Sequence, residues 1–221
     1  MKKYIILIIF TLISFQLISA QGIIPIDNVK ASFSGLSYVQ ITNGAGVGGF
    51  YEKYFAKSHR IGIDASFIIA RGENEYPVYN YYYGQYMERL DKRRLSFLNI
   101  NLRYKKILFV DKIANNFRPF ILASAGPVIA FDPPNVPEIS KRIKNIDTSI
   151  SGNATIGLGI DFLYSGDMGM AFFAGYNYMR FGNKLDPKPT LKENETIDDS
   201  IDLGEKDFSS AIVRISITRK F

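Results

Sequence analysis

The side chains that could carry out chemistry are few and scattered. The chain has no cysteine and a single histidine, His59, in 221 residues, which excludes thiolate metal sites, cysteine nucleophiles and histidine-rich metal centres. Ser58 precedes His59, and a serine nucleophile needs a base within hydrogen-bond reach. Adjacent residues in a turn seldom point together, and no third residue completes a triad. We therefore interpret His59 as a solvated turn residue and expect no catalytic residue, no metal site and no cofactor.

Carboxylates gather in one polar segment near the C-terminus, where calcium would be the metal to consider. The segment holds Asp186, Glu193, Glu195, Asp198, Asp199, Asp202 and Glu205. Their spacing does not follow the Asp-x-Asp-x-Asp-Gly pattern of a calcium loop. We interpret the segment as a solvated acidic loop.

Six tyrosines between residues 71 and 93 are the candidates for contact with another molecule. They are Tyr76, Tyr79, Tyr81, Tyr82, Tyr83 and Tyr86. Tyrosine is common in binding surfaces, and it is also favoured where protein meets a membrane interface. The sequence favours an aromatic belt or self-packing, and a surface-loop binding site for a protein or a sugar is the second hypothesis.

Most of the chain alternates between apolar and polar residues, which is the pattern of strands with one apolar face. Ile61, Ile63 and Phe67 fall on one parity, whereas Asp64 and Ser66 fall on the other. Eight such strands are expected, at 30–41, 45–55, 60–70, 94–107, 117–131, 149–164, 168–181 and 207–221. Pro127 interrupts the fifth strand and predicts a bulge or kink there.

Charged residues occupy the polar parity of these strands. We expect Asp64, Arg103, Asp161 and Arg214 to face the interior of a barrel and to form a charge network there, because buried charges need partners. An eight-stranded barrel has an interior that side chains can fill. We therefore predict a packed polar interior without a wide pore.

The connections between the expected strands alternate in length. Segments 71–93, 132–148 and 182–206 are long and polar, whereas 56–59 and 165–167 are short. Transmembrane barrels have short periplasmic turns and longer outer loops. The pattern predicts that both chain ends are periplasmic and that the long loops lie outside.

The first twenty residues have the layout of a secretory signal peptide. Two lysines precede the apolar run Ile5 to Ile13, and Ile18-Ser19-Ala20 ends the segment. The run is too short and broken to span a bilayer as a helix, which needs about 20 apolar residues. We expect a cleaved signal peptide at 1–20 and one barrel domain at 21–221.

The mature chain resembles the PorT-like, and more broadly the OmpA-like, small outer-membrane β-barrel proteins. The resemblance rests on Gly46-Val47-Gly48-Gly49-Phe50-Tyr51-Glu52, on the segment Arg118 to Pro127, and on Ile156-Gly157-Leu158-Gly159-Ile160-Asp161. The terminal Phe221 is similar to the C-terminal signal that the barrel-insertion machinery reads in outer-membrane barrels. Arg219 departs from that signal, since the third residue from the end is usually apolar. The resemblance implies a Gram-negative outer membrane and a closed eight-stranded antiparallel up-and-down transmembrane β-barrel.

Two kinds of barrel would explain the same alternation of apolar and polar residues. A soluble lipocalin-like barrel would turn the apolar parity inward, whereas a membrane barrel turns it toward lipid. The membrane version would place aromatic girdles near the strand ends, and the candidates are Tyr51, Phe55, Tyr104, Phe131, Phe162, Tyr164 and Phe181. The long loops at one end and the terminal Phe221 favour the membrane version.

The expected role is structural or interaction-based, in protein secretion or envelope integrity, and not enzymatic. The alternative is a channel of the OmpW-like type for small solutes or hydrophobic compounds. Expected partners are outer-membrane lipid, the insertion machinery, and envelope or secretion proteins. The net charge of +6 comes without a clustered basic face, so nucleic acid is not expected.

Overall fold

The computed structural model describes residues 31–70, 78–80, 82–87, 95–110, 117–133, 140, 144, 146–165, 167–185 and 205–221. The expected signal peptide at 1–20 lies outside these residues. Eight long strands dominate them, namely β1 (Ser32–Ile41), β2 (Gly44–Ala56), β3 (His59–Ala70), β6 (Leu95–Ile107), β7 (Phe117–Asp132), β8 (Asp147–Ser165), β9 (Met168–Leu185) and β11 (Ser210–Lys220). Three short strands are β4 (Val78–Asn80), β5 (Gln85–Met87) and β10 (Glu205–Asp207). No helix in the described part is long and apolar enough to cross a membrane.

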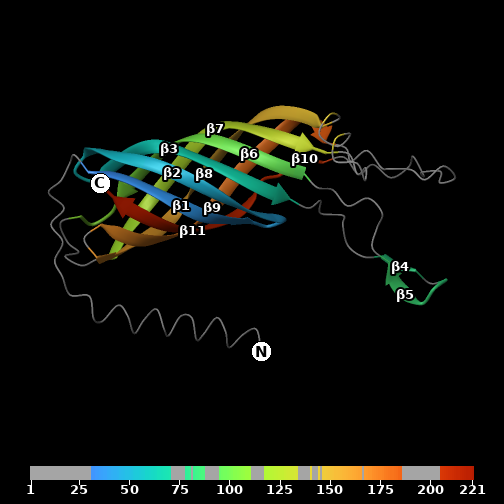
Figure 1. The fold of residues 1–221 in the computed structure, drawn as a ribbon, viewed down its shortest axis with the longest axis horizontal. Coiled ribbons are helices and arrows are strands. Elements are labelled where there is room, and N and C mark those ends of the chain that lie inside the picture. The colour runs from blue at the N-terminus through green and yellow to red at the C-terminus, as the bar shows by residue number, and fades with distance from the viewer. Residues whose placement is uncertain are drawn as a thin grey trace.

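The long strands form a closed antiparallel barrel (Figure 1). Each pairs with the next long strand along the chain, and β1 pairs with β11 from Phe33 opposite Lys220 to Ile41 opposite Ile212. Closure pairs every long strand on both sides, except at the loop end, where the β8–β9 pairing stops at Gly152 opposite Arg180. The strand β10 extends the sheet beside β9, and β4 pairs with β5 in a separate two-stranded sheet. The expected eight-stranded up-and-down barrel is confirmed, and the three short strands are additions to it.

The two ends of the barrel differ. The end of β11 meets the start of β1, where the Ser32 amide donates to the Phe221 carbonyl at 3.2 Å. The tight turns 42–43 and 57–58 close two hairpins at opposite ends. In Figure 1 the C-terminus marks one end, whereas β10 and the β4–β5 hairpin lie toward the other. We call these the terminus end and the loop end.

The ladder passes Pro127 without a bulge, so the expected bulge is wrong. Asn99 lies opposite Val128 and Leu102 lies opposite Ala125, which keeps one register on both sides of the proline. Proline has no amide hydrogen to donate, and the β6–β7 pairing is interrupted there. On its other side β7 pairs with β8 without a break, and Pro127 lies opposite Gly152.

The outer surface of the barrel is apolar. Its exposed residues include Leu36, Val47, Ile61, Ile63, Phe67, Ile69, Ile100, Leu102, Ile150, Ile156, Leu158, Val213, Ile215 and Ile217. A charged interior inside an apolar wall is the arrangement of a transmembrane barrel, and the lipocalin-like alternative, with apolar side chains inside and a polar surface, is wrong. Near the terminus end, Tyr51, Phe55 and Tyr104 are exposed as an aromatic girdle requires. Phe131 and Phe162 are partly exposed, and the side chain of Tyr164 lies outside the described part.

Phe181 does not belong to a girdle, because it is only 2% exposed. It shares the inward parity of β9 with Phe173 and Met179, and its ring stacks on Phe97 at 5.8 Å. Phe208 meets the ring of Phe97 edge-on at 5.0 Å. Phe181 was expected at the membrane interface because it lies near a strand end. Whether a side chain points outward or inward is decided by its parity along the strand, and Phe181 has the inward parity.

The interior is layered, and it is polar only in part. The apolar residues that fill the loop end are Val39, Ile41, Ile68, Leu95, Phe97, Val128, Met179, Phe181, Phe208 and Ile212, which we call the loop-end cluster. A smaller group of Ala31, Phe33, Tyr54 and Ile107 packs at the terminus end. Charged and amide side chains lie between them. The expectation of a polar interior is therefore wrong for both ends.

Inward glycines make room for rings from neighbouring strands. A Cβ at Gly159 of β8 would overlap the Phe120 ring and the Phe172 carbonyl oxygen. A Cβ at Gly35 of β1 would lie 2.6 Å from the Phe50 ring. Glycine leaves the space that lets a cross-strand ring lie flat over the backbone. These glycines thus allow aromatic side chains to fill a narrow barrel.

Candidate functional site

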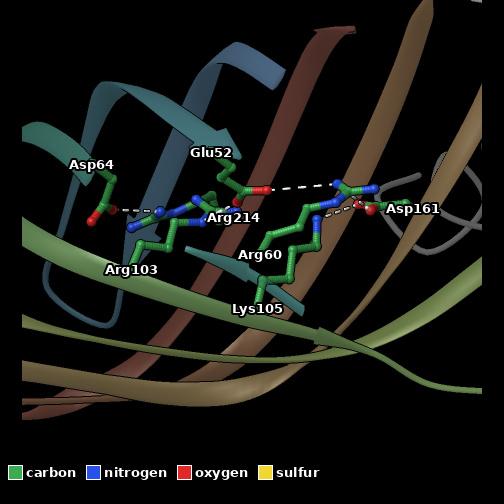
Figure 2. A network of polar contacts seen from close by, with 7 residues as sticks. All are labelled: Glu52, Arg60, Asp64, Arg103, Lys105, Asp161 and Arg214. Atoms are coloured by element: carbon green, nitrogen blue, oxygen red, sulfur yellow. Dashed lines mark hydrogen bonds and ion pairs between the residues drawn. The ribbon is translucent and has the colours of Figure 1, made fainter. Parts of the chain in front are cut away.

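Seven charged side chains meet inside the barrel and form its most distinctive site (Figure 2). Five strands contribute them: Glu52 from β2, Arg60 and Asp64 from β3, Arg103 and Lys105 from β6, Asp161 from β8 and Arg214 from β11. Each is 6% exposed or less. Their inward position follows from the alternation of each strand, which sends every second side chain to the same face. We call this group the charge network.

Five of these residues form a chain of alternating charge. Arg103 Nε lies 2.5 Å from Glu52 Oε1, and Arg60 Nη1 lies 3.6 Å from Glu52 Oε2. Arg60 Nη1 also lies 3.5 Å from Asp161 Oδ2, and Lys105 Nζ donates to Asp161 Oδ1 at 2.7 Å. Neither oxygen of Glu52 accepts a well-aligned hydrogen bond in the described part. Charge, more than hydrogen-bond geometry, therefore holds this carboxylate in place.

A separate pair joins two strands that are distant in the sequence. Arg214 Nη1 donates to Asp64 Oδ2 at 2.7 Å, across 150 positions of the chain. Both side chains are buried. The pair links β11 to β3 through the lumen, across β1 and β2 in the sheet order. It therefore braces the barrel across its interior.

Aromatic rings supply further partners for the cations. The guanidinium of Arg60 lies 3.8 Å from the ring centre of Phe33, and its Nη2 donates to the Tyr54 hydroxyl at 2.7 Å. Lys105 Nζ lies 3.8 Å from the ring centre of Phe120. The negative face of a ring attracts a cation. The network holds four bases and three acids, and the rings help to stabilise the surplus positive charge.

Amide and hydroxyl side chains separate the charge network from the loop-end cluster. Asn99 Nδ2 donates to Ser66 Oγ at 3.3 Å, and Thr155 Oγ1 donates to Asn177 Oδ1 at 2.8 Å. Asn153 Nδ2 contacts Asn99 Oδ1 at 3.4 Å. This layer places polar side chains between the charge network and the loop-end cluster.

The four residues expected inside the barrel all face the interior, but they form one direct pair. Asp64 contacts Arg214, whereas Arg103 contacts Glu52 and Asp161 contacts Lys105 and Arg60. The sequence interpretation missed Glu52, Arg60 and Lys105 as network members. Lys105 already shared the polar parity of Arg103, and Arg60 that of Asp64, so the signal was present. Glycines around Glu52 obscured its parity.

His59 does not lie in a solvated turn. It is the first residue of β3 and its Nδ1 lies 2.7 Å from the Tyr104 hydroxyl, on the outside of the terminus end. Its ring centre is 5.7 Å from that of Phe55. The residue belongs to an interfacial aromatic cluster. Among the described residues, no three His, Cys, Asp or Glu side chains come together as a metal site.

The tyrosine-rich segment forms a hairpin where the structure describes it. Tyr79 of β4 lies opposite Tyr86 of β5, and the turn contains Tyr82 and Tyr83, which are exposed with ring centres 6.4 Å apart. Gly84 has a φ of 62°, which glycine adopts without strain. Tyr76 and Tyr81 lie outside the described residues, as do the acidic residues 186–204. A binding role for these tyrosines therefore stays a hypothesis.

Comparison with known proteins gives matches of fold alone. No family model and no curated protein matches the chain, so the resemblance to PorT-like proteins stays a prediction. Among solved structures, the N-terminal β-barrel domain of Pseudomonas aeruginosa OprF is 9% identical, with a TM-score of 0.43, over 87% of this chain and 98% of that chain. Neisserial surface protein A is 9% identical, with a TM-score of 0.45, over 86% and 94%. Ail of Yersinia pestis is 13% identical, with a TM-score of 0.40, over 86% and 97%. Similarity at this level is not evidence of a shared activity.

Proposed function

We propose that this chain is an integral outer-membrane β-barrel with a structural or protein-interaction role, and that it is not an enzyme. The observation that carries the proposal is the inverted distribution of polarity, with an apolar wall around a buried charge network. A bilayer requires every backbone polar group to be paired within the protein, and a closed barrel meets that requirement.

The proposed route to the outer membrane uses the two ends of the chain. The chain would be exported through residues 1–20, and the barrel-insertion machinery would read the terminal Phe221, which is exposed at the terminus end. Long loops would then face the outside. Envelope or secretion proteins are the proposed partners of the loops or of the periplasmic face, and the exposed Tyr82 and Tyr83 offer contact area there.

The experiment is fractionation of the native envelope followed by a gel with and without heating. We expect the chain in the outer-membrane fraction and a shift in migration on boiling, because a closed barrel resists detergent until it is heated. Lipid A from cells with and without the protein should have the same masses, as a non-enzymatic role requires. A chain that stays in the soluble fraction would overturn the proposal. Cross-linking in the native envelope would then identify the partners.

A further inference from the structure

The barrel wall forks where β8 and β9 separate at the loop end. Their pairing extends to Gly152 opposite Arg180. Beyond that point β8 continues beside β7 to Asp147, whereas β9 pairs with β10, with Glu205 opposite Leu185. A cavity of about 580 Å³ lies at this fork. The cavity is largely open to its surroundings and not enclosed.

The space beside the glycines of the fork is open, and two cations line it. A Cβ at Gly152 or Gly182 would meet no atom within 4 Å. Arg180 from β9 and Lys206 from β10 are exposed and line the same cavity. The Ser151 hydroxyl donates to the Arg180 carbonyl and fixes the backbone at the last rung of the ladder. The fork is thus a positively lined opening on a fixed frame.

The neighbouring acid Asp207 does not line the cavity. Asp207 lies opposite Arg180 in the β9–β10 pairing and its Oδ1 accepts a hydrogen bond from the Ser209 amide at 2.9 Å. It is not among the residues that line the cavity. Among the described residues that line the cavity, Arg180 and Lys206 are charged and none is a carboxylate.

Apolar surface lies on both sides of these cations along the barrel wall, with Ile150 toward the loop end and Ile156 and Tyr178 toward the terminus end. Ile150 and Ile156 are 72% and 62% exposed on the outward face of β8, and Tyr178, which lines the cavity, is 51% exposed. A ligand that fits has an anionic group for the cations and apolar chains for the wall. A membrane lipid with an anionic phosphate head group has this chemistry, and phosphate is bound well by Arg and Lys.

We propose that the fork between β8 and β9 is a binding site for the anionic phosphate head group of a membrane lipid. Arg180 and Lys206 contact the phosphate, Gly152 and Gly182 leave room for it, and the acyl chains lie along the apolar face of β8. The inference rests on the proposed function, since it requires the wall to be in a bilayer. The inference adds to that function the class of lipid that binds at the loop end.

The test uses the full chain in micelles supplied with equal amounts of phosphatidylglycerol and phosphatidylcholine. Native mass spectrometry then counts the lipids retained by the wild type, by R180Q/K206Q and by the single variants R180Q and K206Q. The matched control is K53Q/K106Q, which removes two exposed cations from the terminus end. We expect the wild type and the control to prefer phosphatidylglycerol, and the preference to fall about tenfold in the double variant, with intermediate losses in the single variants.

Equal preference in the wild type and R180Q/K206Q would overturn the inference, as would an equal loss in K53Q/K106Q. Glycerol phosphate is added as a soluble competitor, and displacement of the lipid by it would show that the fork binds free phosphate instead. Heating each variant before electrophoresis reports whether it is a folded barrel. A wild type that never folds in lipid would count against the proposed function, whereas a folded wild type without lipid preference counts against the fork alone.

Discussion

At the scale of single residues, the barrel keeps charges in its interior by giving cations such as Arg60 and Lys105 more than one partner. Arg60 contacts two carboxylates, a hydroxyl and a ring, and Lys105 contacts one carboxylate and one ring. Desolvated charges are costly unless they are paired. The charge network therefore specifies one arrangement of the strands, because another register would separate acids from bases.

The pair formed by Asp64 and Arg214 tests this view. Asp64→Asn leaves the Arg214 guanidinium without its carboxylate in a buried position, and we expect a loss of about 3–5 kcal/mol in the free energy of unfolding. Urea unfolding in lipid vesicles measures it. The matched control is Asp167→Asn in the exposed turn before β9, which should change the free energy by less than about 0.5 kcal/mol.

Replacing both partners separates charge burial from packing. The double variant D64L/R214M should recover much of the stability lost in Asp64→Asn, because no unpaired charge stays buried. Equal stability of the wild type and Asp64→Asn would contradict a bracing role for the pair.

At the scale of strands, rings lie over glycines of the next strand and fix how the strands approach. Phe120 is held from two sides, by Lys105 and by the parallel ring of Phe173 at 6.5 Å. It cannot move aside cheaply for a new side chain at Gly159. The glycines on the polar parity are thus part of the interior packing.

Gly159→Ala should destabilise the barrel by about 1–3 kcal/mol, because its Cβ overlaps the Phe120 ring and the Phe172 carbonyl oxygen. Gly152→Ala on the same strand has open space around its Cβ and should be neutral within about 0.5 kcal/mol. Unfolding midpoints in urea compare the two. Similar midpoints for both variants would contradict the packing account.

The free-energy cost of a charged substitution on the outer wall should depend on its depth in the bilayer. Ile156→Arg places a cation in the middle of the exposed face of β8, and we expect a loss of about 2–4 kcal/mol. Phe55→Arg lies near the end of β2 and should cost about 0–1 kcal/mol. Refolding into vesicles measures both free energies, and equal costs would argue against a graded lipid environment.

The sequence predicted the strands well because alternation is a local property. Every long strand lies within a few residues of its predicted range, and β8 and β9 extend further than expected. Pairing inside the barrel is not local. Nothing in the sequence around Asp64 indicates that Arg214, 150 positions later, is its partner, because that depends on closure and register. The length of β9 was also not evident from the sequence. Phe181 is the last residue of the predicted strand 168–181, which suggested an interfacial position, but β9 continues to Leu185 and Phe181 lies on its inward face.

At the scale of the whole molecule, an apolar cluster fills the loop end above a charged middle. Phe97, Val128 and Met179 are wholly buried there. Apolar side chains across a lumen oppose the passage of ions because they offer no replacement for hydration water. The filled interior supports a structural or interaction role more than the OmpW-like channel.

Planar bilayers provide the corresponding prediction. The reconstituted wild type should give no reproducible single-channel conductance. The double variant F97A/F181A removes two stacked rings of the loop-end cluster, and it should show conductance if the cluster is the barrier. Steady conductance of the wild type would restore the channel hypothesis.

The most direct test of the central claim is the environment of the wall itself. Because the chain has no cysteine, single cysteines at Ile63, Ile156 and Val213, which are exposed on three different strands, can each carry one fluorophore. The protein is refolded into vesicles, and quenching is measured with nitroxide-labelled lipid and with aqueous iodide. The account predicts strong quenching by the lipid and weak quenching by iodide at all three positions. Strong iodide quenching, or protection from both quenchers, would contradict a lipid-facing wall.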